Sequence, residues 1–181
     1  LIRLIREFEP DLVFTPRPDD YHPDHRNTAL LVRDAAYMVT VPNIVAGTPH
    51  LKRNPVFVYL SDNFTKPVPF EPQVVVAIDE VVEKKVDMYH CHESQMYEWL
   101  PYNRGQLESV PQDTAARRAW LAQRMKSTLK GIADKYRKKL VELYGEERGS
   151  KVVYAEAFEI SEYGSPCLLY TSPSPRDRTR S

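Results

Sequence analysis

The residues best suited to chemistry in this 181-residue chain lie in one short run, Asp20-Tyr21-His22-Pro23-Asp24-His25. Histidine ring nitrogens bind metal ions or carry a proton near neutral pH, and carboxylates orient them by hydrogen bonding. His22 and His25 are three residues apart, so on a helix they lie on the same face. Asp24 lies between them and can accept the second ring N–H of a histidine. The run therefore predicts a metal or general acid–base site.

The same residues also have a purely structural interpretation. In it, Asp19 and Asp20 are solvated in a polar loop, and His22 makes only capping contacts at the start of a helix. Spacing alone leaves both interpretations open.

The flanking elements place this run at a strand-to-helix junction. An apolar strand over 11–16 precedes the polar loop, and a helix begins at Pro23, where a proline costs no hydrogen bond. Ligands of open α/β sheets bind beyond the carboxyl ends of the strands. Further apolar segments predict three more strands and two more helices. The strands are expected over 56–60, 74–78 and 151–160, and the helices over 79–100, with Asp79 as N-cap, and 114–145.

This alternation predicts a Rossmann-like, three-layer α/β domain with a mostly parallel sheet and a long helical segment near the C-terminus. We expect it to span residues 1–165 and to lack its N-terminal strand or strands, because the chain begins at Leu1, without Met, inside a helical pattern. Residues 166–181 are rich in Ser, Pro and Arg and resemble translated sequencing-adaptor sequence. A genuine disordered tail is the alternative.

Composition excludes several classes of protein. The 25 basic and 25 acidic residues cancel, which gives no support to nucleic-acid binding. No apolar run approaches the roughly 18 residues of a membrane span. Two cysteines cannot build a disulfide framework, so we expect a cytoplasmic protein, although the missing start leaves export open. Oligomeric state is also left open, a homo-oligomer included.

The run 20–25 resembles the second signature of the PIG-L (LmbE-like) zinc-dependent N-deacetylases. Three other stretches are similar to the same family in the same order. They are the strand Asp11–Thr15, the helix with Lys84-Lys85 that leads to His92-Glu93-Ser94-Gln95, and the strand Val153–Phe158.

The resemblance implies a role for each residue of the run. His25 would be a ligand of Zn²⁺. His22 would stabilise the tetrahedral oxyanion or protonate the leaving amine, and Asp24 would orient His22. The implied reaction removes an N-acetyl group from an amino sugar or glycoconjugate, with water activated by zinc.

One departure from the family is important. Its first signature, His-Pro-Asp-Asp-Glu, would supply two more zinc ligands and the general base, and this sequence does not contain it. We expect those residues to precede Leu1 and this chain to be inactive alone. A non-catalytic member that binds sugar or metal is the alternative. A nucleotide-binding module is disfavoured, because only six glycines are present and none forms a phosphate loop.

Three further features have both a structural and a functional interpretation. His92 is either a half-buried structural histidine or part of the site. The basic residues of 114–145 form either a solvated face or a membrane-surface helix. The aromatic residues Trp99, Tyr102 and Trp120 are either core or a surface that stacks on a sugar.

Overall fold

The computed structural model describes residues 1–166, which divide into two compact units. One unit comprises residues 1–73 and the chain from Phe158 onward, and the other comprises Val74–Ala157. The predicted tail, apart from Pro166, lies outside the described residues. Among those that are described, no helix is long and apolar enough to cross a membrane.

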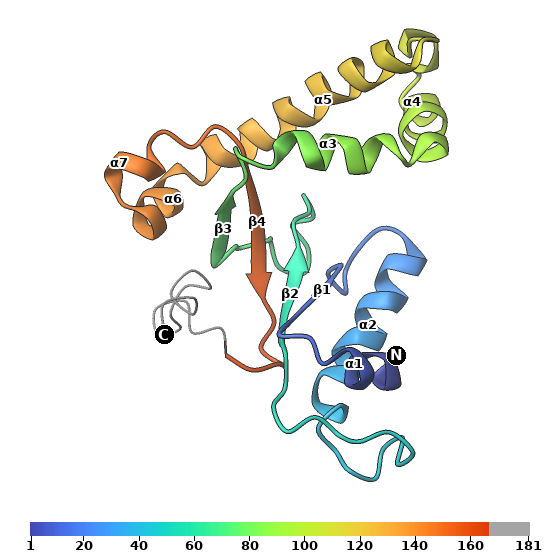
Figure 1. The fold of residues 1–181 in the computed structure, drawn as a ribbon, viewed down its shortest axis with the longest axis vertical. Helices are drawn as coiled ribbons and strands as arrows, with labels where there is room; N and C mark the ends of the chain where they lie inside the picture. The colour runs from blue at the N-terminus through green and yellow to red at the C-terminus, as the bar shows by residue number, and fades with distance from the viewer. Residues whose placement is uncertain (167–181) are drawn as a thin grey trace. The chain divides into compact units, whose positions relative to one another are not determined.

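The strands form a mixed sheet in the order β1-β2-β4-β3 (Figure 1). Their bounds are β1 Leu12–Thr15, β2 Val56–Leu60, β3 Val74–Ala77 and β4 Ala155–Ile160. β1 and β2 are parallel, with Thr15 opposite Tyr59, whereas β2 and β4 are antiparallel, with Val58 opposite Ile160. The α/β class is confirmed, but the mostly parallel sheet and the Rossmann-like, three-layer arrangement are not. Apolar segments satisfy their backbone hydrogen bonds in either direction, so their pattern does not determine strand direction.

The first unit packs two helices, α1 (Ile2–Phe8) and α2 (Pro23–Met38), against β1 and β2. Its buried cluster consists of Ile5, Val32, Ala35, Ala36, Val39, Leu51 and Phe57. β1 is only partly buried, because its apolar residues Leu12 and Phe14 are 43% and 51% exposed. Thr15, at the end of that strand, is 2% exposed.

A single buried arginine holds the segment that follows α2. The guanidinium of Arg6, only 2% exposed, donates hydrogen bonds to six backbone carbonyls. These belong to Met38, Val39, Val41, Ile44, Val45 and Thr48. Because the planar fork has five N–H donors, one side chain satisfies a whole irregular segment.

The second unit is mainly helical. Its elements are α3 (Val82–His90), the π-helix η1 (Ser94–Trp99), α4 (Leu100–Asn103), the 3-10 helix η2 (Leu107–Ser109), α5 (Thr114–Lys135), α6 (Arg137–Tyr144) and α7 (Glu146–Gly149). α3 and α5 lie side by side (Figure 1), joined by Arg118, which donates to Glu83 and Asp87. The charged residues of α5 that pair with α3, and with each other, favour a solvated face.

Two expected helices differ in their bounds. The predicted helix 114–145 is confirmed but is interrupted at Tyr136, and Gly145, with φ of 78°, ends its second part. The predicted helix 79–100 is divided into α3, η1 and the start of α4. Asp79 does not cap it. Its Oδ1 accepts from the backbone N–H groups of Val153 and Tyr154, so the carboxylate holds the two residues that precede β4.

Candidate active site

His22 ends the loop after β1 and is the N-cap of α2. Its Nδ1 accepts a hydrogen bond from the backbone N–H of Asp24 at 3.2 Å, and Pro23 is the first helical residue. An N–H donor requires a lone pair on the acceptor, so neutral His22 carries its proton on Nε2. The histidine thus does what the structural interpretation proposed, and this contact also sets its tautomer.

Asp20 organises the other histidine. Its Oδ1 lies 2.9 Å from Nδ1 of His25 and also accepts from the backbone N–H of His22 at 2.8 Å. A carboxylate oxygen accepts only, so His25 donates through Nδ1 and its Nε2 keeps a lone pair. The Asp20 side chain is 12% exposed, whereas that of His25 is 46% exposed. His25 is therefore an oriented ring with one accessible nitrogen of the kind that binds metal.

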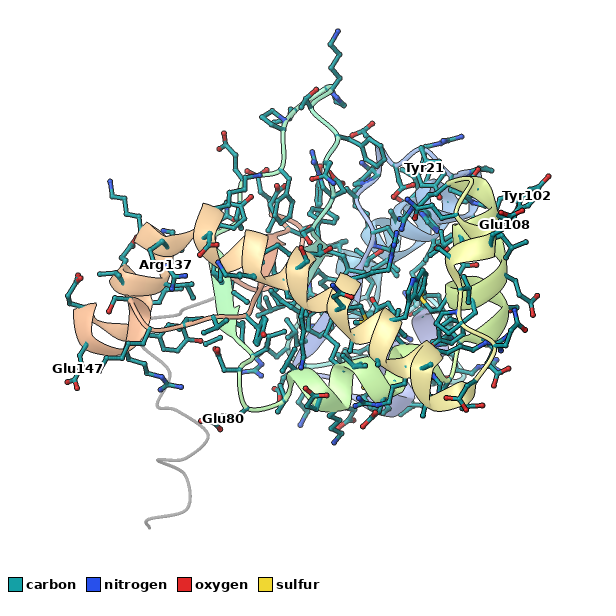
Figure 2. All side chains as sticks on the ribbon, turned by 90° about the horizontal axis from the view of Figure 1, so that it is seen from above. Tyr21, Glu80, Tyr102, Glu108, Arg137 and Glu147 are labelled. Atoms are coloured by element: carbon teal, nitrogen blue, oxygen red, sulfur yellow. The ribbon has the colours of Figure 1, made fainter. Side chains whose placement is uncertain are left out.

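The two histidine rings lie together. Their centroids are 5.0 Å apart, and the ring of Tyr21 meets both edge-on at 5.8 Å. Tyr21, labelled in Figure 2, is 70% exposed. The predicted pair of histidines is thus brought to one place by the first turn of α2.

The Asp24 carboxylate, unlike that of Asp20, makes no hydrogen bond to a histidine. Its Oδ2 lies 3.9 Å from Nδ1 of His22, at ion-pair distance without a hydrogen bond, and the side chain is 85% exposed. The orientation of His22 comes from the backbone N–H of Asp24. The carboxylate is close enough to the ring to favour its positively charged form.

A buried ion pair lies at the same end of the parallel strands. Arg17, 6% exposed, donates to Asp62 at 3.1 Å and to the carbonyl of Val68, which joins the loop after β1 to the loop after β2. Asp62 also accepts from the backbone N–H of Phe64. Sequence reasoning missed Arg17 and Asp62, and it included Asp20 in the run without assigning it the contact to His25. The only signal available was their position in the two loops that follow neighbouring strands.

The donor chemistry of this site fits zinc in part. An imidazole held by a carboxylate is a common zinc ligand, and catalytic zinc sites use three protein ligands. Among residues 1–166, no group of three or more His, Cys, Asp or Glu side chains is placed to hold a metal ion. At the carboxyl end of β1, Oγ1 of the buried Thr15 has no hydrogen-bond partner within the described chain. The described residues thus offer one oriented ligand and an unsatisfied hydroxyl.

Two of the other three similar stretches, the Lys-rich helix and all but the last residue of the strand 153–158, lie in the second unit. Lys85 forms an ion pair with Glu156, which joins the Lys-rich helix to the closing strand. His92 is exposed, so its half-buried interpretation is wrong, and its ring lies 6.5 Å from that of Tyr89. Cys91 is also exposed.

The first unit contains the stretch that matches a known family. Residues 1–36 match the family model PIG-L: GlcNAc-PI de-N-acetylase. The matched stretch covers α1, β1, the loop with Asp20 and His22, and most of α2, including His25. The family match therefore falls on the candidate site.

Three solved structures have a similar fold. N,N′-diacetylchitobiose deacetylase from Pyrococcus horikoshii is 21% identical, with a TM-score of 0.55 over 97% of this chain and 53% of that chain. The 4-carboxy-2-hydroxymuconate hydratase from Pseudomonas putida is 16% identical, with a TM-score of 0.59 over 88% and 55%. The conserved protein TT1542 from Thermus thermophilus is 19% identical, with a TM-score of 0.57 over 96% and 60%.

These likenesses establish the fold and not the reaction. The chain spans a little more than half the length of each of the three proteins. Because one of these proteins is a deacetylase and another is a hydratase, the shared fold does not identify the reaction, and only the residues of the site can indicate it.

Proposed function

We propose that this chain carries the histidine-bearing part of a zinc-dependent hydrolase that removes the N-acetyl group of an amino sugar or glycoconjugate. The observation that carries the proposal is His25, held through Nδ1 by Asp20 inside the stretch that matches the de-N-acetylase model. The similar fold of a diacetylchitobiose deacetylase supports an acetylated sugar as the substrate.

In this proposal, His25 would hold the metal through Nε2, and Asp20 would fix the ring and raise its basicity. Bound zinc would lower the pKa of a water molecule and polarise the acyl carbonyl. Both effects depend on a ligand whose ring cannot rotate. The 2.9 Å contact between Asp20 and His25 supplies that constraint.

His22 would act on the amide itself. With Nδ1 occupied by the N–H of Asp24, its Nε2–H can donate to an oxygen that gains negative charge or transfer a proton to the leaving amine. The nearby carboxylate of Asp24 would stabilise the ring when it is positively charged.

The described residues offer no group of three metal ligands, so we expect the 181-residue chain to bind zinc weakly and to release no acetate. Activity would require a longer protein that carries a His-Pro-Asp-Asp-Glu segment ahead of Leu1. A non-catalytic member that binds sugar or metal is the alternative, and its fold would be the same.

The test uses that longer protein loaded with zinc. Acetate release is measured on N,N′-diacetylchitobiose, with zinc content determined after dialysis. His25→Ala should lose both metal and activity, whereas His22→Ala should keep metal and lose about 100-fold or more in rate. His50→Ala is the matched control, because this histidine lies far along the chain from the run.

Three results would count against the proposal. Equal loss of zinc in both variants would contradict the division of roles. Hydration of an unsaturated dicarboxylate without acetate release would favour the hydratase chemistry. Zinc binding with neither reaction would favour the non-catalytic alternative.

A further inference from the structure

Two large aromatic side chains of the second unit are exposed side by side. The ring centroids of Trp99 and Tyr102 lie 6.1 Å apart with an interplanar angle of 30°. Trp99 is 53% exposed and Tyr102 is 66% exposed, and Figure 2 shows Tyr102 at the outer edge of its helical segment. Aromatic rings carry large apolar area, so a neighbouring pair exposed to water is a candidate contact surface.

The pair borders a surface hollow of about 420 Å³. Ligand pockets typically measure about 300–1,000 Å³. Its other lining residues are Ser94, Gln95, Glu98 and Leu107. Within the described chain, the side chains of Ser94, Gln95 and Glu98 have no hydrogen-bond or ion-pair partner, so their polar groups are free to meet a ligand.

The π-helix accounts for this grouping. Its i→i+5 bonding widens the turn, so Ser94, Gln95 and Trp99 share one face of η1, and α4 then presents Tyr102 beside it. π-Helical turns are rare and are frequently found at functional sites. The unusual backbone therefore serves to gather polar and aromatic side chains on one surface.

Trp120 does not belong to this surface. It packs against Tyr97, with ring centroids 6.3 Å apart, and the guanidinium of Arg124 covers its ring at 4.6 Å. Of these three aromatic residues, Trp120 is partly buried against the core, and Trp99 and Tyr102 are exposed.

We infer that the hollow bounded by Trp99 and Tyr102 is a carbohydrate-binding site that takes a pyranose ring of an amino-sugar chain. The electron-rich faces of the two rings attract the C–H groups on the apolar face of a pyranose. Ser94, Gln95 and Glu98 offer hydroxyl, amide and carboxylate groups to its hydroxyls and N–H. The carboxylate of Glu98 disfavours anionic ligands, and a purely apolar ligand would use none of the three polar groups.

The choice of an amino sugar rests on the proposed function, but the site itself contains none of its catalytic residues. Binding is therefore measured without turnover. The protein is the 181-residue chain, and the probe is N,N′,N″-triacetylchitotriose.

The experiment exploits the small number of tryptophans, Trp99 and Trp120. In a Trp120→Phe background, Trp99 alone reports on the hollow, and we expect a saturable change in its fluorescence as the sugar is added. Tyr102→Ala in that background should weaken binding about tenfold or more. Trp99→Ala removes the fluorescent reporter, so its sugar binding is measured by calorimetry, and it should weaken by a similar factor. Tyr37→Ala is the matched control, since Tyr37 is also 66% exposed and lies on α2. It should leave the affinity unchanged.

Three results would overturn the inference. They are the absence of saturable sugar binding in the unsubstituted chain, an unchanged affinity in Trp99→Ala, and a response to tetramethylammonium but not to the sugar, which would indicate a cation site. Circular dichroism of each variant confirms that it is folded. His25→Ala separates the two proposals, because it should leave sugar binding intact. Sugar binding without acetate release in the longer protein would reject only the proposed function, and the reverse would reject only this site.

Discussion

The Oδ1 atom of Asp20 lies 2.9 Å from Nδ1 of His25 and, at the same time, 2.8 Å from the backbone nitrogen of His22. One carboxylate oxygen thus fixes the ring of one histidine and the backbone of the other. Because Asp20 precedes the helix, His22 is its N-cap and His25 lies on its first turn, this contact couples the shape of the loop to the orientation of the site.

Asp20→Asn should weaken zinc binding about 10- to 100-fold in the longer, zinc-loaded protein, the usual effect of removing a group that orients a ligand. The amide can still accept from the backbone of His22, so the fold should be retained. Zinc titration with a competing chelator measures the change. Asp19→Asn alters the exposed neighbour and should have no effect. An unchanged affinity in Asp20→Asn would show that the carboxylate has no role in metal binding.

Asp24→Asn separates the backbone of this residue from its carboxylate. The variant keeps the N–H that caps His22 and loses the charge 3.9 Å from its ring. We expect almost unchanged thermal stability and a deacetylation rate lowered about two- to fivefold, because an exposed charge without a hydrogen bond stabilises the ring by at most about 1 kcal/mol. If Asp24 served only the helix dipole, it would contribute about 0.3–1 kcal/mol to stability. A slightly lower melting temperature with normal turnover would then be observed.

Arg6→Met should lower the free energy of unfolding by about 2–4 kcal/mol, because several buried carbonyls lose their donor. The side chain of methionine fills similar space without N–H groups. Urea unfolding followed by circular dichroism measures the change. Arg3→Met, on the exposed face of the same helix, should cost less than about 0.5 kcal/mol. Equal effects of the two substitutions would contradict the role assigned to Arg6.

Glu83 should contribute to the acid sensitivity of the second unit. The hydrogen bonds from Lys126 and Arg118 hold the pKa of its carboxyl below the ordinary value of 4.5. A lowered pKa in the folded state stabilises the protein above pH 4.5, and this contribution is lost as the pH falls through the lowered value.

Glu83→Gln should therefore lower the melting temperature at neutral pH and reduce its further fall below about pH 4.5. Thermal unfolding followed at a series of pH values gives both quantities. Glu80→Gln is the control, because Glu80 is exposed and the ion pairs of Arg118 and Lys126 are formed with Glu83 and Asp87 instead. Parallel pH profiles for Glu83→Gln and the unsubstituted chain would exclude this contribution.

The sequence by itself determined the local parts of this protein. Pro23 at the first helical position and His25 three residues after His22 depend only on backbone geometry over one turn, so the junction from β1 to α2 was predictable. The same holds for the long helix that begins at Thr114, whose apolar residues recur with the helical period.

Only the tertiary structure decided which distant groups meet. Arg6 bonds to carbonyls 32 to 42 residues away, and Arg17 pairs with Asp62 across 45 residues. Such contacts leave no periodic pattern in the sequence. Nothing in the sequence around an arginine shows whether its side chain is buried or solvated. The antiparallel direction of β4 and the separation of Trp120 from Trp99 were undetermined for the same reason: they depend on how the chain packs, and local propensity does not encode that.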